Sequence, residues 1–288
     1  ANPVPPDPVR LNYPDFLDAE LRRSLGAGFE PVLQAMLGRA PVDLRVNLGR
    51  GTLKNAQDTL AKDDISTQTV PGVPTALRVT GNPRRVNNST AFTSGLVDLQ
   101  DASSQAVALF ARPEPGMNVL DYCAGGGGKA LALYDAVGPK GQVTAHDIAT
   151  VRMNDLPARA ARAGARIRIV GPGHKALQNK GFDLVFVDAP CSGTGSWRRT
   201  PDAKWRIRPK DIARLDAVQS DILEKAAKLV RPGGVLCYAT CSVLKCENDD
   251  QVARFLHAHS DFSADGAIHL TPLTSGDGFF AARLQRNT

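Results

Sequence analysis

Two cysteines lie where two strands of a parallel sheet are expected to end. Cys191 follows the apolar run 184–187 within Asp-Ala-Pro-Cys, and Cys241 follows the run 235–238 within Ala-Thr-Cys-Ser. In an open α/β sheet, ligands bind at the carboxyl ends of the strands. A thiolate is a strong nucleophile, and nearby cations or helix N-termini lower its pKa. The pattern therefore predicts two thiols at one sheet edge, in a position to do nucleophilic chemistry.

A third apolar run, 117–122, leads into the glycine-rich segment Cys123-Ala124-Gly125-Gly126-Gly127-Gly128-Lys129. Glycines allow positive φ and close approach of a ligand to the backbone, and the helix that follows offers unpaired N–H groups. The next expected strand ends at Asp147, whose carboxylate can accept hydrogen bonds from ribose hydroxyls. The segment also fits a dinucleotide fingerprint, so these residues predict a nucleotide-like cofactor without excluding NAD.

Asp188 lies three residues before Cys191 and could assist its chemistry. Carbon 5 of a pyrimidine is a poor nucleophile, but it becomes reactive when a thiolate adds to carbon 6. An acid that protonates or hydrogen-bonds ring nitrogen 3 makes that addition easier. For this role Asp188 must be protonated or share a proton, so we expect its pKa to rise when the ligand binds. Cys237, in mid-strand, is expected to be a small core residue.

The elements that must position these residues alternate between strand and helix after residue 116. Strands are expected at 117–122, 142–147, 166–170, 183–188 and 234–241, and helices at 127–137, 149–163, 210–230 and 247–257. This alternation predicts an α/β fold with a mostly parallel sheet covered by helices on both faces. Residues 278–285 are expected to add an edge strand.

The first part of the chain has a different, α+β pattern. Helices are expected at 15–26, 29–37 and from a Thr52 cap to 60, strands at 42–48 and 76–79, and a polar loop at 82–89. We therefore predict a small N-terminal region at 1–88 and a larger domain at 89–288. The first helix of the larger domain is expected to run to Ala111, capped by Ser103 or Ser104.

Composition limits the class of protein. The 288 residues are 42% hydrophobic and 22% charged, as in soluble globular proteins, and no run approaches the roughly 20 apolar residues of a membrane span. The segment Ala1–Pro8 lacks a signal pattern. Five cysteines without a CxxC pair argue against a disulfide scaffold and against zinc. We expect a cytoplasmic monomer that binds neither a metal nor a membrane.

A basic segment follows the Cys191 loop directly. The chain has a net charge of +6, which permits a polyanionic partner. Between Trp197 and Lys210 there is one acid, Asp202, among the cations Arg198, Arg199, Lys204, Arg206, Arg208 and Lys210. Cations beside the expected site suit RNA phosphates, and Trp197 or Trp205 could stack on a base. The alternative is a solvated basic loop, and adjacency to Cys191 favours RNA, with a target base that must be flipped out.

Taken together, these motifs resemble the Nol/Nop/Sun family of RNA cytosine-5 methyltransferases, and within it the bacterial RsmB-like enzymes of 16S rRNA. The resemblance covers most of the chain from Pro14 onward, and the paired Pro-Cys and Thr-Cys motifs are its most specific part. The matching segments are 44–47, 97–105, 121–129, 188–195, 198–205, 238–242, 247–248 and 276–281.

The resemblance implies a class I, Rossmann-like methyltransferase that uses S-adenosylmethionine to make 5-methylcytosine. It implies that Cys241 attacks carbon 6, that Cys191 assists release of the product, and that Asp188 contacts the base near nitrogen 3. Lys129 would lie at the active-site end of the cofactor loop. The implied cofactor-binding residues are Cys123, Ala124, Gly125, Gly126, Gly127, Gly128, Lys129, Asp147, Arg152 and Asp188. The expected RNA-binding residues are Arg45, Asn47, Arg198, Arg199, Lys204, Trp205 and Arg206.

Departures from the family pattern keep alternatives open. The usual Cys-Ala-Ala-Pro-Gly-Gly-Lys-Thr is replaced by 123–130 with extra glycines, and Pro172 stands where an aspartate often contacts the adenine amino group. A NusB-like domain that the family often carries at its N-terminus does not occur in this sequence, through truncation or true absence. We favour ribosomal RNA over transfer RNA as the substrate. The rival hypotheses are a non-catalytic RNA-binding or assembly factor and, last, a nicotinamide-dependent oxidoreductase.

Overall fold

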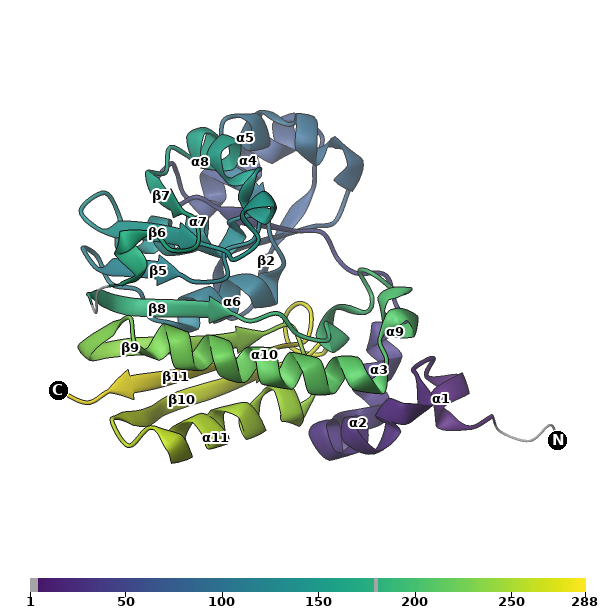
Figure 1. The fold of residues 1–288 in the computed structure, drawn as a ribbon. Coiled ribbons are helices and arrows are strands. Elements are labelled where there is room, and N and C mark those ends of the chain that lie inside the picture. Colours follow the sequence, from purple (N-terminus) through teal and green to yellow (C-terminus); the bar gives the residue numbers. More distant parts are fainter. Residues whose placement is uncertain (1–4, 179–180) are drawn as a thin grey trace.

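A computed structural model describes residues 5–178 and 181–288 of the chain, and these residues form two β-sheets with their helices (Figure 1). Residues 1–4 lie outside the described residues. They are the first four residues of the predicted N-terminal region 1–88 and the first half of the segment 1–8, for which no signal pattern was found. The larger sheet has the order β10-β11-β9-β8-β5-β6-β7. Its strands are β5 (Asn118–Asp121), β6 (Gln142–His146), β7 (Ile167–Val170), β8 (Phe182–Asp188), β9 (Val230–Thr240), β10 (Phe262–Leu270) and β11 (Phe279–Arg286).

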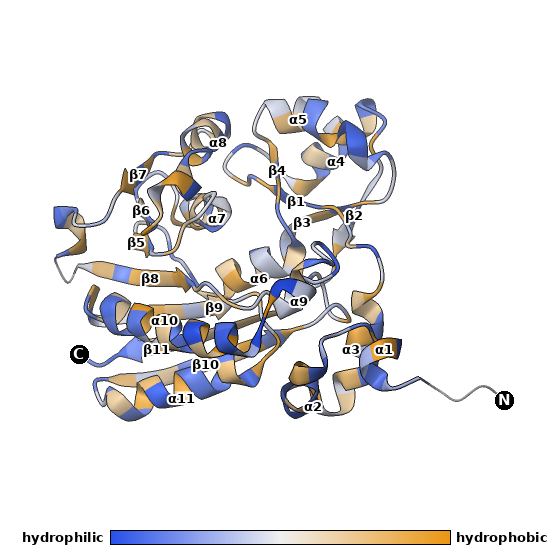
Figure 2. Ribbon diagram, turned by 45° about the vertical axis from the view of Figure 1, so that its right-hand side comes forward, coloured by the Kyte–Doolittle hydropathy of each residue, from blue (hydrophilic) through white to orange (hydrophobic). Residues whose placement is uncertain are grey.

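Strands β5 to β9 pair in parallel, which confirms the predicted mostly parallel sheet. Alternate residues of a strand face opposite sides of a sheet, and here both sides are apolar. Val119 faces a core with α6 (Ala102–Phe110), α7 (Gly128–Val137) and α8 (Leu156–Ala163). Leu120 faces a second core with α10 (Pro209–Ala227) and α11 (Asp249–Ala258). In Figure 2, β8 is mostly orange, whereas α10 and α11 alternate between blue and orange.

Several local predictions need correction. Strand β11 is not an edge strand, because it pairs antiparallel with both β9 and β10. The edge strand β10 was missed, since few of its residues are buried and it lacks an apolar run. Asp101 caps α6, accepting from the backbone N–H groups of Ser103 and Ser104. The loop predicted at 82–89 contains a 3-10 helix, η3 (Pro83–Asn88), and the helix predicted at 149–163 is divided into η4 (Thr150–Met153) and α8.

The N-terminal part forms a four-stranded antiparallel sheet of order β2-β3-β1-β4. One of its strands, β4, lies at residues 97–99, within the region predicted to belong to the larger domain. The predicted domain boundary at residues 88 and 89 stays a prediction. The strands are β1 (Asp43–Val46), β2 (Thr67–Val70), β3 (Val73–Val79) and β4 (Val97–Leu99). The helices are α1 (Asp7–Arg10), α2 (Asp18–Leu25), α3 (Phe29–Met36), α4 (Leu53–Lys62) and α5 (Thr90–Thr93), with η1 (Asp15–Leu17) and η2 (Gly26–Gly28).

The two parts of the chain share a core and enclose a cavity. Apolar side chains of α2 and α3 pack with Trp197 and Leu244, which belong to loops of the larger domain. Short elements complete these loops: η5 (Lys175–Leu177), η6 (Thr194–Ser196), α9 (Ala203–Arg206) and η7 (Lys245–Glu247). Among the described residues, no helix has the length and apolar character needed to cross a bilayer.

Candidate active site

The two predicted thiols meet beyond the ends of neighbouring strands. Strands β8 and β9 are parallel partners, with Asp188 opposite Ala239, so their carboxyl ends lie together. Cys241 directly follows β9, and Cys191 lies three residues beyond the end of β8. Their Sγ atoms are 3.3 Å apart, and both are free thiols. One thiol can therefore donate a hydrogen bond to the other.

Cys191 is the member of this thiol pair whose surroundings raise its pKa. The pKa of Cys191 is raised well above its usual value, first by its hydrogen bond with Cys241, then by burial and by the charge of Glu247. A thiol with a raised pKa is a poor nucleophile at neutral pH and a hydrogen-bond donor. The raised pKa of Cys191 thus favours Cys191 as the donor in this hydrogen bond.

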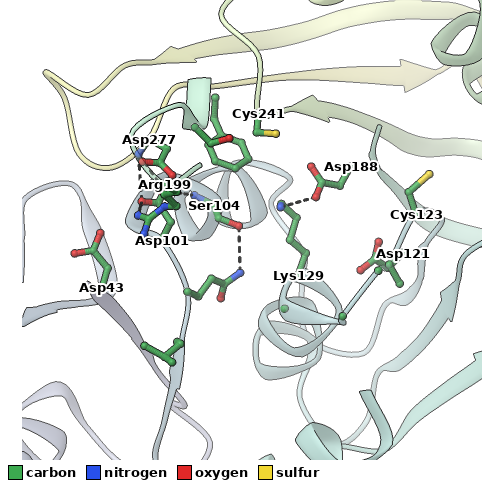
Figure 3. A pocket seen from close by; sticks show the side chains of 18 of the residues that line it. Asp43, Asp101, Ser104, Asp121, Cys123, Lys129, Asp188, Arg199, Cys241 and Asp277 are labelled. Atoms are coloured by element: carbon green, nitrogen blue, oxygen red, sulfur yellow. Dashed lines mark hydrogen bonds and ion pairs between the residues drawn. The ribbon is translucent and has the colours of Figure 1, made fainter. Parts of the chain in front are cut away.

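Lys129 and Asp188 form an ion pair beside Cys241 (Figure 3). Lys129 lies in the first turn of α7, and its Nζ is 2.7 Å from Asp188 Oδ2 and 5.1 Å from the centre of the Phe279 ring. Burial lowers the pKa of Lys129, but the charges of Asp188 and Cys241 outweigh it, so its pKa is raised. A cation is therefore retained where a thiolate would form.

The glycine-rich loop adopts backbone conformations that require glycine. Gly125 and Gly127 have φ of +50° and +79°, and a Cβ on Gly127 would lie 2.2 Å from Leu156 Cδ1. Asp147, which is buried, accepts hydrogen bonds from the backbone N–H groups of Gly125 and Ala149 at 3.0 and 2.9 Å. Asp147 therefore ties the loop to the end of β6, and its contact with a ribose stays a prediction.

A cavity of about 620 Å³ opens beside this loop, a volume within the range of small-molecule sites. Its walls include most of the predicted cofactor residues and Cys241, although neither Gly127 nor Asp147 lines it. The predicted residues on its walls are Cys123, Ala124, Gly125, Gly126, Gly128, Lys129, Arg152 and Asp188. Pro172 is exposed after β7 and contributes no side-chain acceptor.

Asp121 is the functional candidate that sequence reasoning missed. It ends β5 and lines the cavity, but it is fully buried, and neither carboxylate oxygen has a hydrogen-bond partner among residues 5–178 and 181–288. Burial first, then the charge of Asp188, raises the pKa of Asp121 to about 7. An unpartnered buried carboxylate is costly unless a ligand supplies a donor or a positive charge. Its signal in the sequence was an acid at a strand end, immediately before the glycine loop.

These features fit S-adenosylmethionine. The cofactor carries a sulfonium and an ammonium group, which an unpartnered carboxylate such as Asp121 can balance. The glycine loop leaves room for close approach to the backbone, because it carries no Cβ atoms at 125–128. Within the described part of the chain, no group of three or more His, Cys, Asp or Glu side chains is arranged to hold a metal ion.

Most of the residues predicted to bind RNA make contacts within the chain. Arg45 and Asn47 are buried: Arg45 pairs with Asp135 at 3.2 Å, and Asn47 donates to the carbonyl of Ala163 at 2.9 Å. These contacts fasten β1 of the N-terminal sheet to α7 and α8. They show a role in joining the two parts of the chain, and contact with RNA stays a prediction.

The basic segment after Cys191 is also largely engaged. Arg198 and Arg199 both pair with Asp277, and Lys204 is buried and donates to the carbonyl of Asn12. Trp197 is 2% exposed, so a stacking role for it is excluded in this structure, whereas Trp205 is 57% exposed. Arg206 is exposed but pairs with Asp202. Trp205 is thus the tryptophan of this segment that a base can reach.

Comparison with known proteins identifies the family. The model for the 16S rRNA methyltransferase RsmB/F family matches residues 108–285, and the model for the ferredoxin-like domain of RsmF/B-like methyltransferases matches residues 13–87. This chain belongs to the RsmB/F family. The assignment confirms the predicted family and S-adenosylmethionine as the cofactor, and it does not support the nicotinamide alternative.

Individual RsmB/F relatives agree. Ribosomal RNA small subunit methyltransferase B of Klebsiella pneumoniae subsp. pneumoniae is 35% identical over 287 residues, covering 96% of this chain. The protein of the same name from Yersinia pestis is 35% identical over 94% of this chain. The chain spans 66% of the length of each of these relatives. A methyltransferase homolog from Pyrococcus horikoshii, 24% identical, has the same fold, with a TM-score of 0.83 and 97% of both chains covered.

Proposed function

We propose that this protein methylates carbon 5 of a cytosine in 16S rRNA, using S-adenosylmethionine and a covalent bond between Cys241 and carbon 6 of the base. The observation that carries the proposal is the pair of thiols, 3.3 Å apart, with Cys241 on the wall of the cavity that also holds Lys129 and Asp188. A nucleotide-like cofactor beside a nucleophile is what this chemistry needs.

The chain's residues have distinct parts in the proposed reaction. The Cys241 thiolate donates an electron pair to carbon 6, and the electrons of the 5,6 double bond move to carbon 5. When bound, the cofactor supplies an electrophilic methyl group, which carbon 5 takes. A proton acceptor then removes the proton from carbon 5, the double bond between carbons 5 and 6 re-forms, and the Cys241 sulfur leaves as a thiolate. The Cys191 thiol, 3.3 Å away, donates a hydrogen bond to that departing sulfur.

Asp188 and Lys129 lie on the same cavity wall as the nucleophile. Their ion pair presents a carboxylate oxygen and an ammonium group, an acceptor and a donor that match the amino group and ring nitrogen 3 of cytosine. Binding of the base would thus replace part of an existing ion pair. The alternative from the sequence, a protonated Asp188 that donates to nitrogen 3, stays a prediction.

A tritiated-methyl transfer assay on unmodified 16S rRNA tests the proposal. We expect Cys241→Ala to abolish transfer, and Cys191→Ala to accumulate an RNA–protein adduct that survives denaturation, because release is slowed. Cys246→Ala is the control, since Cys246 packs in the core shared with α2 and α3 and not on the cavity wall. Full transfer by Cys241→Ala would refute the nucleophile assignment.

Experiments with the same purified protein also distinguish the proposed function from two alternatives. A transfer-RNA methyltransferase would label transfer RNA and not 16S rRNA. A non-catalytic RNA-binding factor would bind RNA but show no heat of S-adenosylmethionine binding in calorimetry. Bisulfite sequencing of RNA from cells with and without the protein identifies the target nucleotide directly.

A further inference from the structure

Glu247 is a fully buried carboxylate whose position the proposed chemistry does not yet explain. It lies in η7, after the Cys241 loop, and its oxygens accept hydrogen bonds from the backbone N–H and hydroxyl of Ser192 and from Gln219 Nε2. Among the described residues, no Lys, Arg or His pairs with it. Burial of a carboxylate without a cation costs free energy, so its neutral donors must hold it in place.

These contacts fix the residues on both sides of Cys191. Ser192 is bound directly by Glu247, and Gln219 of α10 donates both to Glu247 at 3.1 Å and to the carbonyl of Pro190 at 3.0 Å. The Tyr238 hydroxyl donates to the backbone carbonyl of Glu247 at 2.7 Å, which ties η7 back to β9. The loops that carry the two thiols are therefore joined through one carboxylate.

Charges of opposite sign act on the two members of the thiol pair. The Cys241 side interacts with a cation, because the charge of Cys241 helps to raise the pKa of Lys129. The Cys191 side interacts with an anion, because the charge of Glu247 raises the pKa of Cys191. The Tyr238 phenol also interacts with Cys191, and its own pKa is raised, mainly by burial. The negative charge of Glu247 beside Cys191 therefore favours the protonated form of the Cys191 thiol.

We propose that Glu247 is a positioning residue for product release: it holds the Cys191 loop against Cys241 so that Cys191 remains the hydrogen-bond donor. This inference rests on the proposed function. Glu247 is fully buried and does not line the cavity beside the glycine loop, so in this proposal it acts only through Cys191. Its loss should slow the breaking of the bond between Cys241 and carbon 6, and leave the formation of that bond nearly unchanged.

The first test separates adduct formation from release in Glu247→Gln and Glu247→Ala. In single-turnover experiments with 16S rRNA, we expect the adduct to persist roughly 10- to 100-fold longer in Glu247→Ala. This is below the roughly 10²–10⁴ that a positioned proton donor contributes, because Cys191 itself is still present in the variant. Glu247→Gln should rescue part of this loss, because an amide oxygen can still accept from the Ser192 N–H. Adduct formation should change by less than about twofold, since Glu247 does not contact the nucleophile.

The second test needs no RNA. We measure alkylation of each cysteine by iodoacetamide at pH 8, using mass spectrometry, and expect Cys191 to react several-fold faster in Glu247→Gln than in the wild type, because thiolate reactivity follows the pKa. Glu20→Gln is the matched control: Glu20 accepts from the backbone N–H of Cys246, also in η7, but touches neither cysteine loop. Ser192→Ala, which removes one donor to Glu247, replaces Glu247→Ala if that variant does not fold.

The outcomes separate this inference from the proposed function. Unchanged Cys191 alkylation in Glu247→Gln overturns the positioning role, and so does slowed adduct formation with unchanged release. Methyl transfer by Cys241→Ala instead overturns the proposed function, while the alkylation experiment still decides whether Glu247 controls Cys191.

Discussion

Replacing Asp121 by Asn should stabilise the protein relative to the wild type, and this gain in stability should be larger at high pH than at low pH. The Asp121 carboxyl is buried without a partner, and its pKa rises from 3.8 to about 7, first because of burial. Between these two values the folded protein holds a proton that the unfolded chain has released. Stability therefore falls as pH rises from about 4 to 7 and levels off above 7. Asn carries no charge, so this loss is absent in the variant.

The size of the effect follows from the two pKa values. A difference of about three in pKa corresponds to about 4 kcal/mol at pH 8, and to only about 1.7 kcal/mol at pH 5, where the folded carboxyl is still protonated. The stability difference between Asp121→Asn and the wild type should thus grow by about 2–3 kcal/mol from pH 5 to pH 8. Comparing two pH values cancels the constant cost of burying an amide.

Urea unfolding without cofactor at pH 5, 6, 7 and 8 measures this change. Asp64→Asn is the exposed control, because the Asp64 side chain is 73% exposed. A change with pH that is larger for Asp121→Asn than for Asp64→Asn isolates the effect of burial. A difference for Asp121→Asn that stays constant with pH would refute the reasoning, since it would mean that Asp121 is ionised at no cost. We also expect Asp121→Asn to weaken S-adenosylmethionine binding in calorimetry, as the balancing negative charge is lost.

The remaining predictions concern the cofactor loop and the tryptophans. Gly127→Ala should lower the free energy of unfolding by about 1–3 kcal/mol, because φ is +79° and the new Cβ meets Leu156 at 2.2 Å. Gly193→Ala isolates the backbone share in the same unfolding assay, because Gly193 has a similar conformation, with φ of +68° and ψ of +19°, and its Cβ would make only an ordinary contact at 3.6 Å. Trp205→Ala should weaken RNA binding by about 1–3 kcal/mol at unchanged stability. Trp197→Ala should instead destabilise the fold by about 3–5 kcal/mol, and equal effects of the two tryptophan variants on melting temperature would contradict this division.

Hydrophobic patterning accounts for much of the site. Strands ending at Asp121, Asp188 and Thr240 were predictable from apolar runs, and parallel strands present their carboxyl ends at one edge. The meeting of Cys191 and Cys241 follows from that rule. The same signal failed at β10, because an edge strand with a solvated face has too few apolar residues to be recognised.

By itself, the sequence determined the local elements and the edge of the sheet where chemistry can occur, since both depend on the periodicity of neighbouring residues. Only the tertiary structure decided which charged side chains are paired within the chain and which are available to a ligand. Arg45 meets Asp135 and Arg198 meets Asp277 across the fold, whereas Asp121 meets no partner. A pattern of residue types cannot distinguish a solvated cation from a buried one, because burial and pairing depend on packing between distant segments. For the same reason, the attachment of Glu247 to the Cys191 loop is visible only in the folded chain.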